Sequence, residues 1–170
     1  MKDNKIIGLK RGTVVLKKYN KEWVNMFETE KRFLEDLLGD IAIDIQHIGS
    51  TAIPGLVAKP IIDMLMAIKS FDIFLKIKLS LENAEYKYRE NGSDDKQILF
   101  VKGPEEFRTH YLHITKLGSS VWKNDIAFRD YLCTHPEAVH EYKNLKESLS
   151  LKYADDRKSY TAGKVTLLNQ

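Results

Sequence analysis

The chain has 170 residues, of which 43% are hydrophobic and 30% are charged. At about 150 residues per domain, this length predicts one domain over residues 1–170 and excludes a two-domain enzyme of ordinary size. The net charge is +3, but the residues up to Lys21 carry +6, which leaves −3 for the rest of the chain. Because a nucleic-acid surface needs clustered lysine and arginine, this balance predicts no nucleic-acid partner.

The single cysteine, Cys133, excludes an internal disulfide and a CxxC zinc site, and it favours a reducing compartment. In residues 1–20 no apolar run reaches the ~7 residues of a signal-peptide core, and nothing in the chain approaches the ~18 residues of a membrane span. We therefore expect a cytoplasmic protein without a membrane partner.

The pattern of the N-terminal part changes from strand-like to helical at Lys21. Residues 1–12 are basic and are expected to be loose, and the β-branched run 13–17 predicts a short strand. Apolar residues then recur at helical spacing and predict an amphipathic helix that ends at Gly39. Glu30 lies inside this stripe, where it either reaches solvent or one basic partner, or is a carboxylate directed into a site. The stripe consists of Trp23, Phe27, Leu34, Leu37 and Leu38.

Strand patterns dominate the middle of the chain. Alternation over 41–48 predicts a strand, and a loop containing glycine and proline follows from 49 to 60. The run 61–68 is nearly all apolar, as in a strand buried on both faces, and Asp63 is its one charge. Ser70 caps a predicted helix over 71–84. Further strands are predicted at 85–90, 97–102 and 110–116.

The C-terminal part is helical in pattern, with helices predicted at 119–133, 136–153 and 157–168. Pro136 suits a first helical turn, so it separates the first of these helices from the second. The strands do not alternate regularly with helices as they do in a doubly wound fold. The sequence therefore predicts an α+β domain with a mixed or mostly antiparallel sheet covered by helices.

Residues 47–68, HIGSTAIPGLVAKPIIDMLMAI, carry the candidate chemistry. A buried carboxylate costs several kcal/mol unless it is paired or bound to a cation, so Asp63 needs a partner. A divalent cation is suitable, because it takes oxygen ligands from both carboxylates and phosphates. Gly49 and Ser50 offer an open backbone and a hydroxyl donor to a phosphate, and Lys59 adds positive charge.

The spacing of Gly49-Ser50 and Asp63 resembles the signature of the polymerase-β-type nucleotidyltransferase superfamily. More closely, the chain resembles the uncharacterised GrpB family, whose members carry a GSTAxPGLxxKPIID core like residues 49–63. The likeness extends over most of the chain from about residue 14. It includes Trp23, Glu30, HYLHI at 110–114, FRDYL at 128–132 followed by HP, and YTAGK at 160–164.

This resemblance implies a nucleotidyltransferase-like mixed sheet and a nucleotide or phosphorylated small molecule as the ligand, with Mg²⁺ or Mn²⁺ held by Asp63. In active superfamily members a second acid follows two residues after the first, whereas Leu65 stands there in this chain, which weakens the case for a two-metal centre.

Two functions remain open. One is nucleotidyl transfer with Asp63 and Ser50 as catalytic residues and an unidentified acceptor. The other is an inactive binding or accessory module for a nucleotide or phosphorylated metabolite.

Histidines are candidates for further metal ligands. On the strand predicted at 110–116, His113 points away from the core side chains and would lie beside Asp63 if the two strands are neighbours. With His47 it would complete an Asp/His/His set, which suits a transition metal at least as well as Mg²⁺. Alternatively, His47 and His113 each bond a backbone carbonyl or cap the end of a strand. We prefer that interpretation for His110, His135 and His140.

Cations for a phosphate are expected from the C-terminal helices. Tyr160 and Lys164 are four residues apart on a predicted helix, so that the ring and the ammonium can contact one ligand together. Arg129 is suited to a bidentate contact with phosphate, or to an ion pair with Glu30. The remaining candidate phosphate ligands are Gly49, Ser50, Thr51, Lys59 and Arg108.

Overall fold

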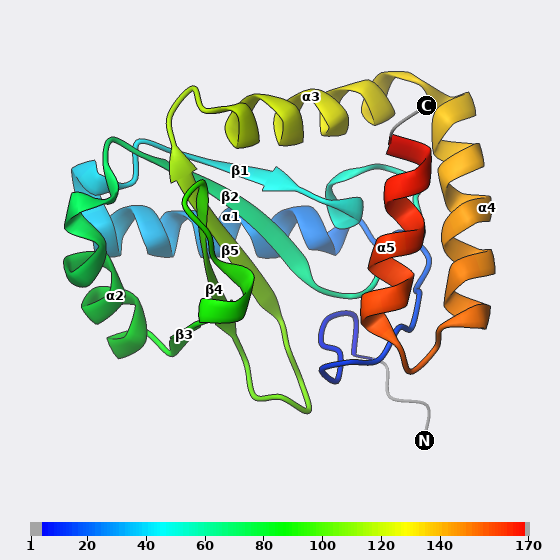
Figure 1. The fold of residues 1–170 in the computed structure, drawn as a ribbon, viewed down its shortest axis with the longest axis horizontal. Coiled ribbons are helices and arrows are strands. Elements are labelled where there is room, and N and C mark those ends of the chain that lie inside the picture. Colours follow the sequence, from blue (N-terminus) through cyan, green and yellow to red (C-terminus); the bar gives the residue numbers. More distant parts are fainter. Residues whose placement is uncertain (1–4, 169–170) are drawn as a thin grey trace.

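A five-stranded mixed sheet forms the centre of the protein in the computed structural model, which describes residues 5–168 (Figure 1). The strand order is β1-β2-β5-β4-β3; β2 and β5 are parallel, and the other neighbours are antiparallel. The α+β prediction is thereby confirmed. The strands are β1 (Asp44–Ile48), β2 (Ile62–Ile68), β3 (Tyr86–Tyr88), β4 (Gln97–Lys102) and β5 (His110–Lys116).

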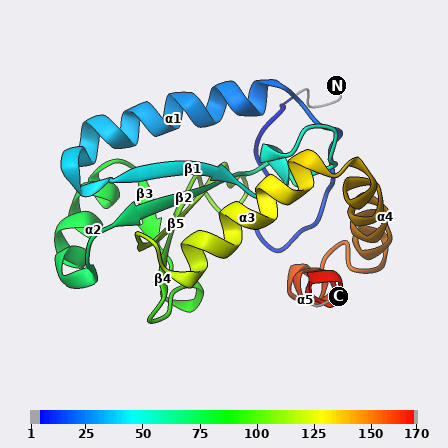
Figure 2. The ribbon, with the colours of Figure 1, turned by 90° about the horizontal axis from the view of Figure 1, so that it is seen from above.

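Helices cover both faces of the sheet. Figure 2 shows α1 on one face, α3 on the other, and α4 with α5 at one end of the molecule. No helix in the described part of the chain is long and apolar enough to cross a membrane. The helices are α1 (Glu22–Leu38), α2 (Phe74–Asn83), α3 (Ser120–Thr134), α4 (Pro136–Lys152) and α5 (Arg157–Leu168).

The main core lies between the sheet and the helices α1 and α2. Trp23 and Leu34 of α1 are fully buried, and they belong to one apolar cluster with Met64 and Met66 of β2. Because side chains alternate along a strand, Asp63 is on the opposite face of β2 from these methionines. Packing on the first face therefore leaves Asp63 on the second, beneath the C-terminal helices.

A second apolar cluster holds the loop that precedes β2. Ile53 and Leu56 of this loop pack against Leu132 of α3 and Tyr142 of α4. All four side chains are almost completely buried. The loop that carries the Gly-Ser motif is thus packed against the C-terminal helices.

The N-terminal segment is hydrogen-bonded to the body of the protein. The backbone N–H of Gly8 donates to the carbonyl of Pro60 at 2.7 Å, and Leu9 forms an isolated β-bridge with Arg108. The expectation of a loose segment is therefore corrected for residues 5–12, the part that the structure describes.

The strand predicted at 13–17 is absent from the described sheet. The N–H of Val14 donates to the carbonyl of Ala154 at 2.8 Å, whereas Lys17 forms an isolated bridge with Ala58. This prediction was wrong because the backbone partners of the segment lie in separate loops, so that no continuous ladder forms.

Glu30 is buried between α1 and the sheet. It accepts a hydrogen bond from the Tyr86 hydroxyl and another from the Lys102 ammonium, both at 2.7 Å. Burial alone would raise the pKa of Glu30, but these two donors outweigh it and hold the pKa below its usual value. The alternative with one basic partner describes Glu30, although that partner is Lys102 and not Arg129.

We expect Glu30→Gln to lower the free energy of unfolding by about 1–3 kcal/mol at pH 7, because the substitution leaves the Lys102 ammonium without a charged partner. The pKa of Glu30 is lowered on folding. Its contribution is therefore present above about pH 4 and is lost as the pH falls through the folded-state pKa. Urea denaturation from pH 7 to pH 3 should show the wild type and variant converging.

The exposed Glu28 on the same helix gives the matched control. Glu28→Gln should change the unfolding free energy by less than about 0.5 kcal/mol. Equal effects of the two substitutions would contradict the assigned role of Glu30.

Candidate functional site

The Gly-Ser turn lies directly against Asp63. In the antiparallel β1–β2 pair, Ile48 is opposite Asp63, so the turn begins beside that carboxylate. Gly49 has φ 72°, and a Cβ there would be 2.7 Å from Oδ2 of Asp63. Both the backbone conformation and the contact therefore require glycine. Ser50 then begins a short 3₁₀ helix, Ser50–Ala52.

His113 stands beside Asp63 on the same face of the sheet, as the strand pattern predicted. The parallel β2–β5 pairing brings Nε2 of His113 to 3.7 Å from Oδ1 of Asp63. Burial alone would raise the pKa of Asp63, but His113, Lys59 and Arg157 hold it below its usual value. Asp63 is therefore ionised at neutral pH in a cationic environment.

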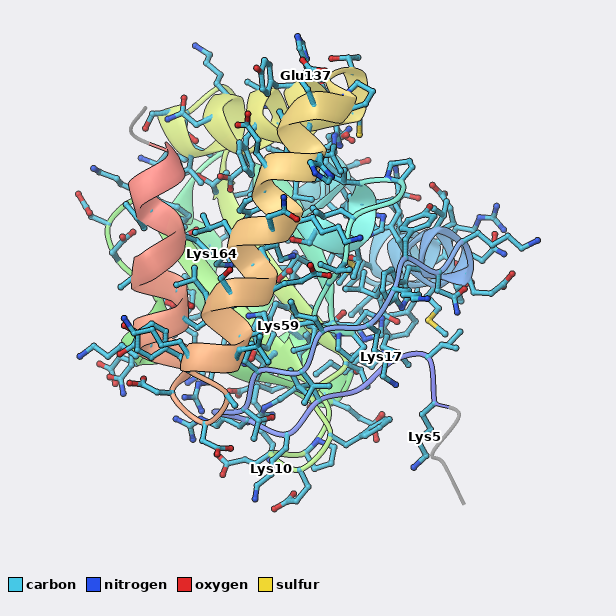
Figure 3. All side chains as sticks on the ribbon, turned by 90° about the vertical axis from the view of Figure 1, so that its right-hand side faces the viewer. Lys5, Lys10, Lys17, Lys59, Glu137 and Lys164 are labelled. Atoms are coloured by element: carbon cyan, nitrogen blue, oxygen red, sulfur yellow. The ribbon has the colours of Figure 1, made fainter. Side chains whose placement is uncertain are left out.

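Two of the predicted phosphate ligands flank the ring of Tyr160. The Nζ atoms of Lys59 and Lys164 are 5.6 and 4.9 Å from the ring centroid. Figure 3 looks onto α4 and α5 and shows both lysines in this part of the molecule. Burial, with Arg157 and Lys164, lowers the pKa of Lys59 to about 7. Burial also lowers the pKa of Lys164.

The ring of Tyr160 lies among these groups. The residue is fully buried, and its oxygen has no hydrogen-bond partner among the described residues. An unpaired buried hydroxyl is costly, so a ligand atom that bonds it would gain free energy.

Lys146 of α4 is a further cation of the site, and the sequence analysis missed it. Its buried ammonium donates to Oγ of Ser50 and, at 2.6 Å, to the carbonyl of Val57. Burial lowers the pKa of Lys146 well below its ordinary value. These bonds hold the Gly-Ser turn in place. The signal for Lys146 was its position four residues after Tyr142, within the buried stripe of the helix.

Arg157 and Asp125 also belong to the site, although the sequence patterns did not indicate them. Arg157, at the start of α5, donates to the hydroxyl of Tyr111 at 2.6 Å. Asp125 of α3 belongs to the same charged group: burial and Asp63 raise its pKa, and His113 opposes them. Neither residue belongs to a sequence motif, because tertiary packing alone brings them to Asp63.

His47, Thr51 and Arg129 are not gathered around Asp63. His47 is on the opposite face of the sheet, stacked on the ring of Phe27 at 4.7 Å between centroids. Its Nε2 is 2.9 Å from Oγ1 of Thr51, so the two side chains bond each other. Burial lowers the pKa of His47 to about 4. Arg129 donates to the Gln46 side chain and to the carbonyl of His47, and so ties α3 to β1.

The expected Asp/His/His metal set is therefore not assembled. Within residues 5–168, no group of three His, Cys, Asp or Glu side chains is arranged to hold a metal ion. The ammonium of Lys59 and the guanidinium of Arg157 also act on Asp63 and oppose a second cation there. This donor set does not fit a two-metal centre, whereas its excess of cations fits an anion.

The fold and the site define an α+β protein with a Gly-Ser turn and one central carboxylate set among lysines. The model of the GrpB protein family matches residues 13–170. The chain belongs to the GrpB family.

Relatives agree with this assignment. The chain is 35% identical to the glutamate-rich protein GrpB of Alkalihalophilus pseudofirmus, over 97% of both proteins. It is 37% identical to the UPF0157 protein YqkA of Bacillus subtilis over 86% of its own length, but spans 42% of that protein. The crystal structure of the conserved protein GrpB from Enterococcus faecalis matches with a TM-score of 0.80 and 28% identity, over 91% of this chain and 98% of that one.

We expect Gly49→Ala to destabilise the protein more than Gly55→Ala does. Both glycines have positive φ, 72° and 79°, but a Cβ at Gly55 meets nothing within 4 Å. Gly55→Ala should cost about 1–2 kcal/mol through the backbone alone, and Gly49→Ala about 2–5 kcal/mol because the methyl also displaces Asp63. Urea denaturation gives both values, and equal values would refute the close approach of Gly49 to Asp63.

Proposed function

We propose that this protein binds a phosphorylated small molecule, with a nucleoside triphosphate as the first candidate, on the Asp63 face of the sheet. The observation that carries the proposal is the excess of basic side chains over carboxylates. Lys59, Lys146 and Lys164 gather around Asp63, and the pKa of each lysine is lowered by burial and by another lysine or arginine nearby. A bound phosphate would supply the missing negative charge.

The residues have distinct roles in this proposal. Gly49 and Ser50 present the open backbone and the hydroxyl of the turn to the phosphate. Lys59 and Lys164 neutralise its charge, while Lys146, held by Ser50 and Val57, acts as a positioning residue for the turn. The ring of Tyr160 lies near the Nζ atoms of both Lys59 and Lys164, and its buried hydroxyl has no hydrogen-bond partner among the described residues.

Binding in this proposal does not require a metal. Nucleotidyl transfer with Asp63 and Ser50 as catalytic residues stays a prediction, supported by the family resemblance and by the Asp63–His113 pair. Leu65 and the cations around Asp63 favour the binding module. Incubation with labelled nucleotides and a cell metabolite extract separates the two functions: release of pyrophosphate would establish the enzyme.

We expect Lys164→Gln to weaken the binding of ATP, GTP, CTP or UTP by at least about tenfold, because it removes a partly buried cation from the phosphate site. Isothermal calorimetry with and without Mg²⁺ measures the dissociation constants. In the absence of metal, Asp63→Asn should tighten binding, since it removes the negative charge closest to the phosphate.

Lys76→Gln on the exposed side of α2 is the matched control, and its dissociation constant should equal that of the wild type. Two results would overturn the proposal: unchanged binding by Lys164→Gln, or no measurable binding of any triphosphate by the wild type. Weaker binding by Asp63→Asn in Mg²⁺ alone would instead assign a metal to Asp63.

Phosphate binding should be accompanied by proton uptake at pH 8. The pKa of Lys59 is about 7 in the free protein, so that its amine is mostly neutral at pH 8. A neighbouring phosphate raises this pKa, because it favours the charged form. Calorimetry in buffers of different ionisation enthalpy should show the uptake in the wild type and its loss in Lys59→Met. Heats that do not depend on the buffer would contradict this role of Lys59.

A further inference from the structure

A cavity of about 700 Å³ lies against the start of α5 and the strands β4 and β5. Its walls come from segments far apart in the sequence: the N-terminal segment, the loop after β3, the strands β4 and β5 with Arg108 just before β5, and the first turns of α5. The basic residues that line it are Arg11, Arg89, Arg108, Arg157 and Lys158.

No acidic residue lines the described walls of this cavity. Glu105, in the adjacent loop, is the carboxylate that compensates part of the charge: its Oε1 is 2.5 Å from Nη1 of Arg11 and 3.8 Å from Nη2 of Arg108. One carboxylate meets two guanidinium groups, so a clear positive excess remains. This excess is local, since the chain after Lys21 carries a net negative charge.

The walls are built into the fold. Arg108 is 3% exposed and donates to the carbonyl of Gly103, so its guanidinium is fixed. The N-terminal segment is fastened to residues 105–108 by the Leu9–Arg108 bridge and by the bond from the Arg11 N–H to the carbonyl of Glu105. A cationic wall held in this way is pre-organised for an anion.

The cavity also has an apolar side. Leu99, Val101 and Tyr111 line it from the sheet, and the guanidinium of Arg157 lies 4.9 Å from the centroid of the Tyr111 ring. Arginine stacked on an aromatic ring is suited to a planar or apolar group beside a charged one. The volume lies within the ~300–1,000 Å³ that is usual for small-molecule sites.

We infer that this arginine cavity binds a small molecule with at least two anionic groups, phosphate or carboxylate, and an apolar or planar part. Neither Asp63 nor the lysines of its cluster line this cavity, and the inference does not rest on the proposed function. Arg157 connects the two sites, because it lines the cavity and also lowers the pKa values of Asp63 and Lys59. Two anionic ligands would therefore lie next to each other across Arg157.

Calorimetric titration with inorganic tripolyphosphate and with citrate tests this inference, and the two probes distinguish phosphate from carboxylate recognition. The test variant is Arg89→Gln/Lys158→Gln, since both residues line the cavity and neither is fully buried. Its control, Lys69→Gln/Lys76→Gln, removes the same charge at exposed positions. The test variant should bind the better probe at least about tenfold more weakly than the wild type, and the control within about twofold.

Lys164→Gln separates this cavity from the lysine cluster. Two sites are supported if each variant loses one tripolyphosphate site and keeps the other. Lys164→Gln should lose the site at the lysine cluster, and the Arg89/Lys158 variant should lose the site in the arginine cavity. Loss in Lys164→Gln alone overturns the arginine cavity and leaves the proposed function standing. Equal weakening by the Arg89/Lys158 variant and its control also overturns it, because that result reflects overall charge. Unchanged urea denaturation midpoints confirm that the variants are folded.

Discussion

The contact between Gly49 and Asp63 is the constraint on which the rest of the site depends. Because of this contact, the turn after β1 lies directly against Asp63, the only charged residue of β2. The turn can approach so closely because Gly49 has no side chain. The loop that follows must then cross to the C-terminal helices, where Lys146 bonds Ser50 and Val57. The position of Asp63 thus connects the sheet, the turn and α4, and the surrounding cations follow from that connection.

The two faces of the sheet differ in how their charged side chains are paired. On the α1 face, Glu30 has Tyr86 and Lys102 as partners, so its charge is satisfied within the protein. On the α5 face, Lys59 and Lys164 flank the ring of Tyr160 and share the carboxylate of Asp63 with Lys146. Buried charge that is compensated internally stabilises a fold, whereas uncompensated charge is typical of a binding site.

Much of this arrangement could be predicted from local pattern. The helices, the strands of the sheet and the placing of His113 beside Asp63 all follow from periodicity and from the alternation of faces. His47 could also have been placed correctly, because it continues the alternation of Ile45, which puts it on the core face. Arg157 could not, since it reaches the site through long-range packing of helices, which leaves no motif in the chain. For Lys146, the helical spacing from Tyr142 indicates a shared face but not the contact with Ser50.

The single parallel pairing of the sheet has a consequence for how the protein folds. β2 and β5 are joined by a long crossover that contains α2, β3 and β4, whereas β1 and β2 are joined by a loop. Pairings that close long loops form slowly, because the entropy of closure precedes the gain from contacts. The Gly-Ser turn can therefore form early beside Asp63, while His113 arrives only when the crossover is complete.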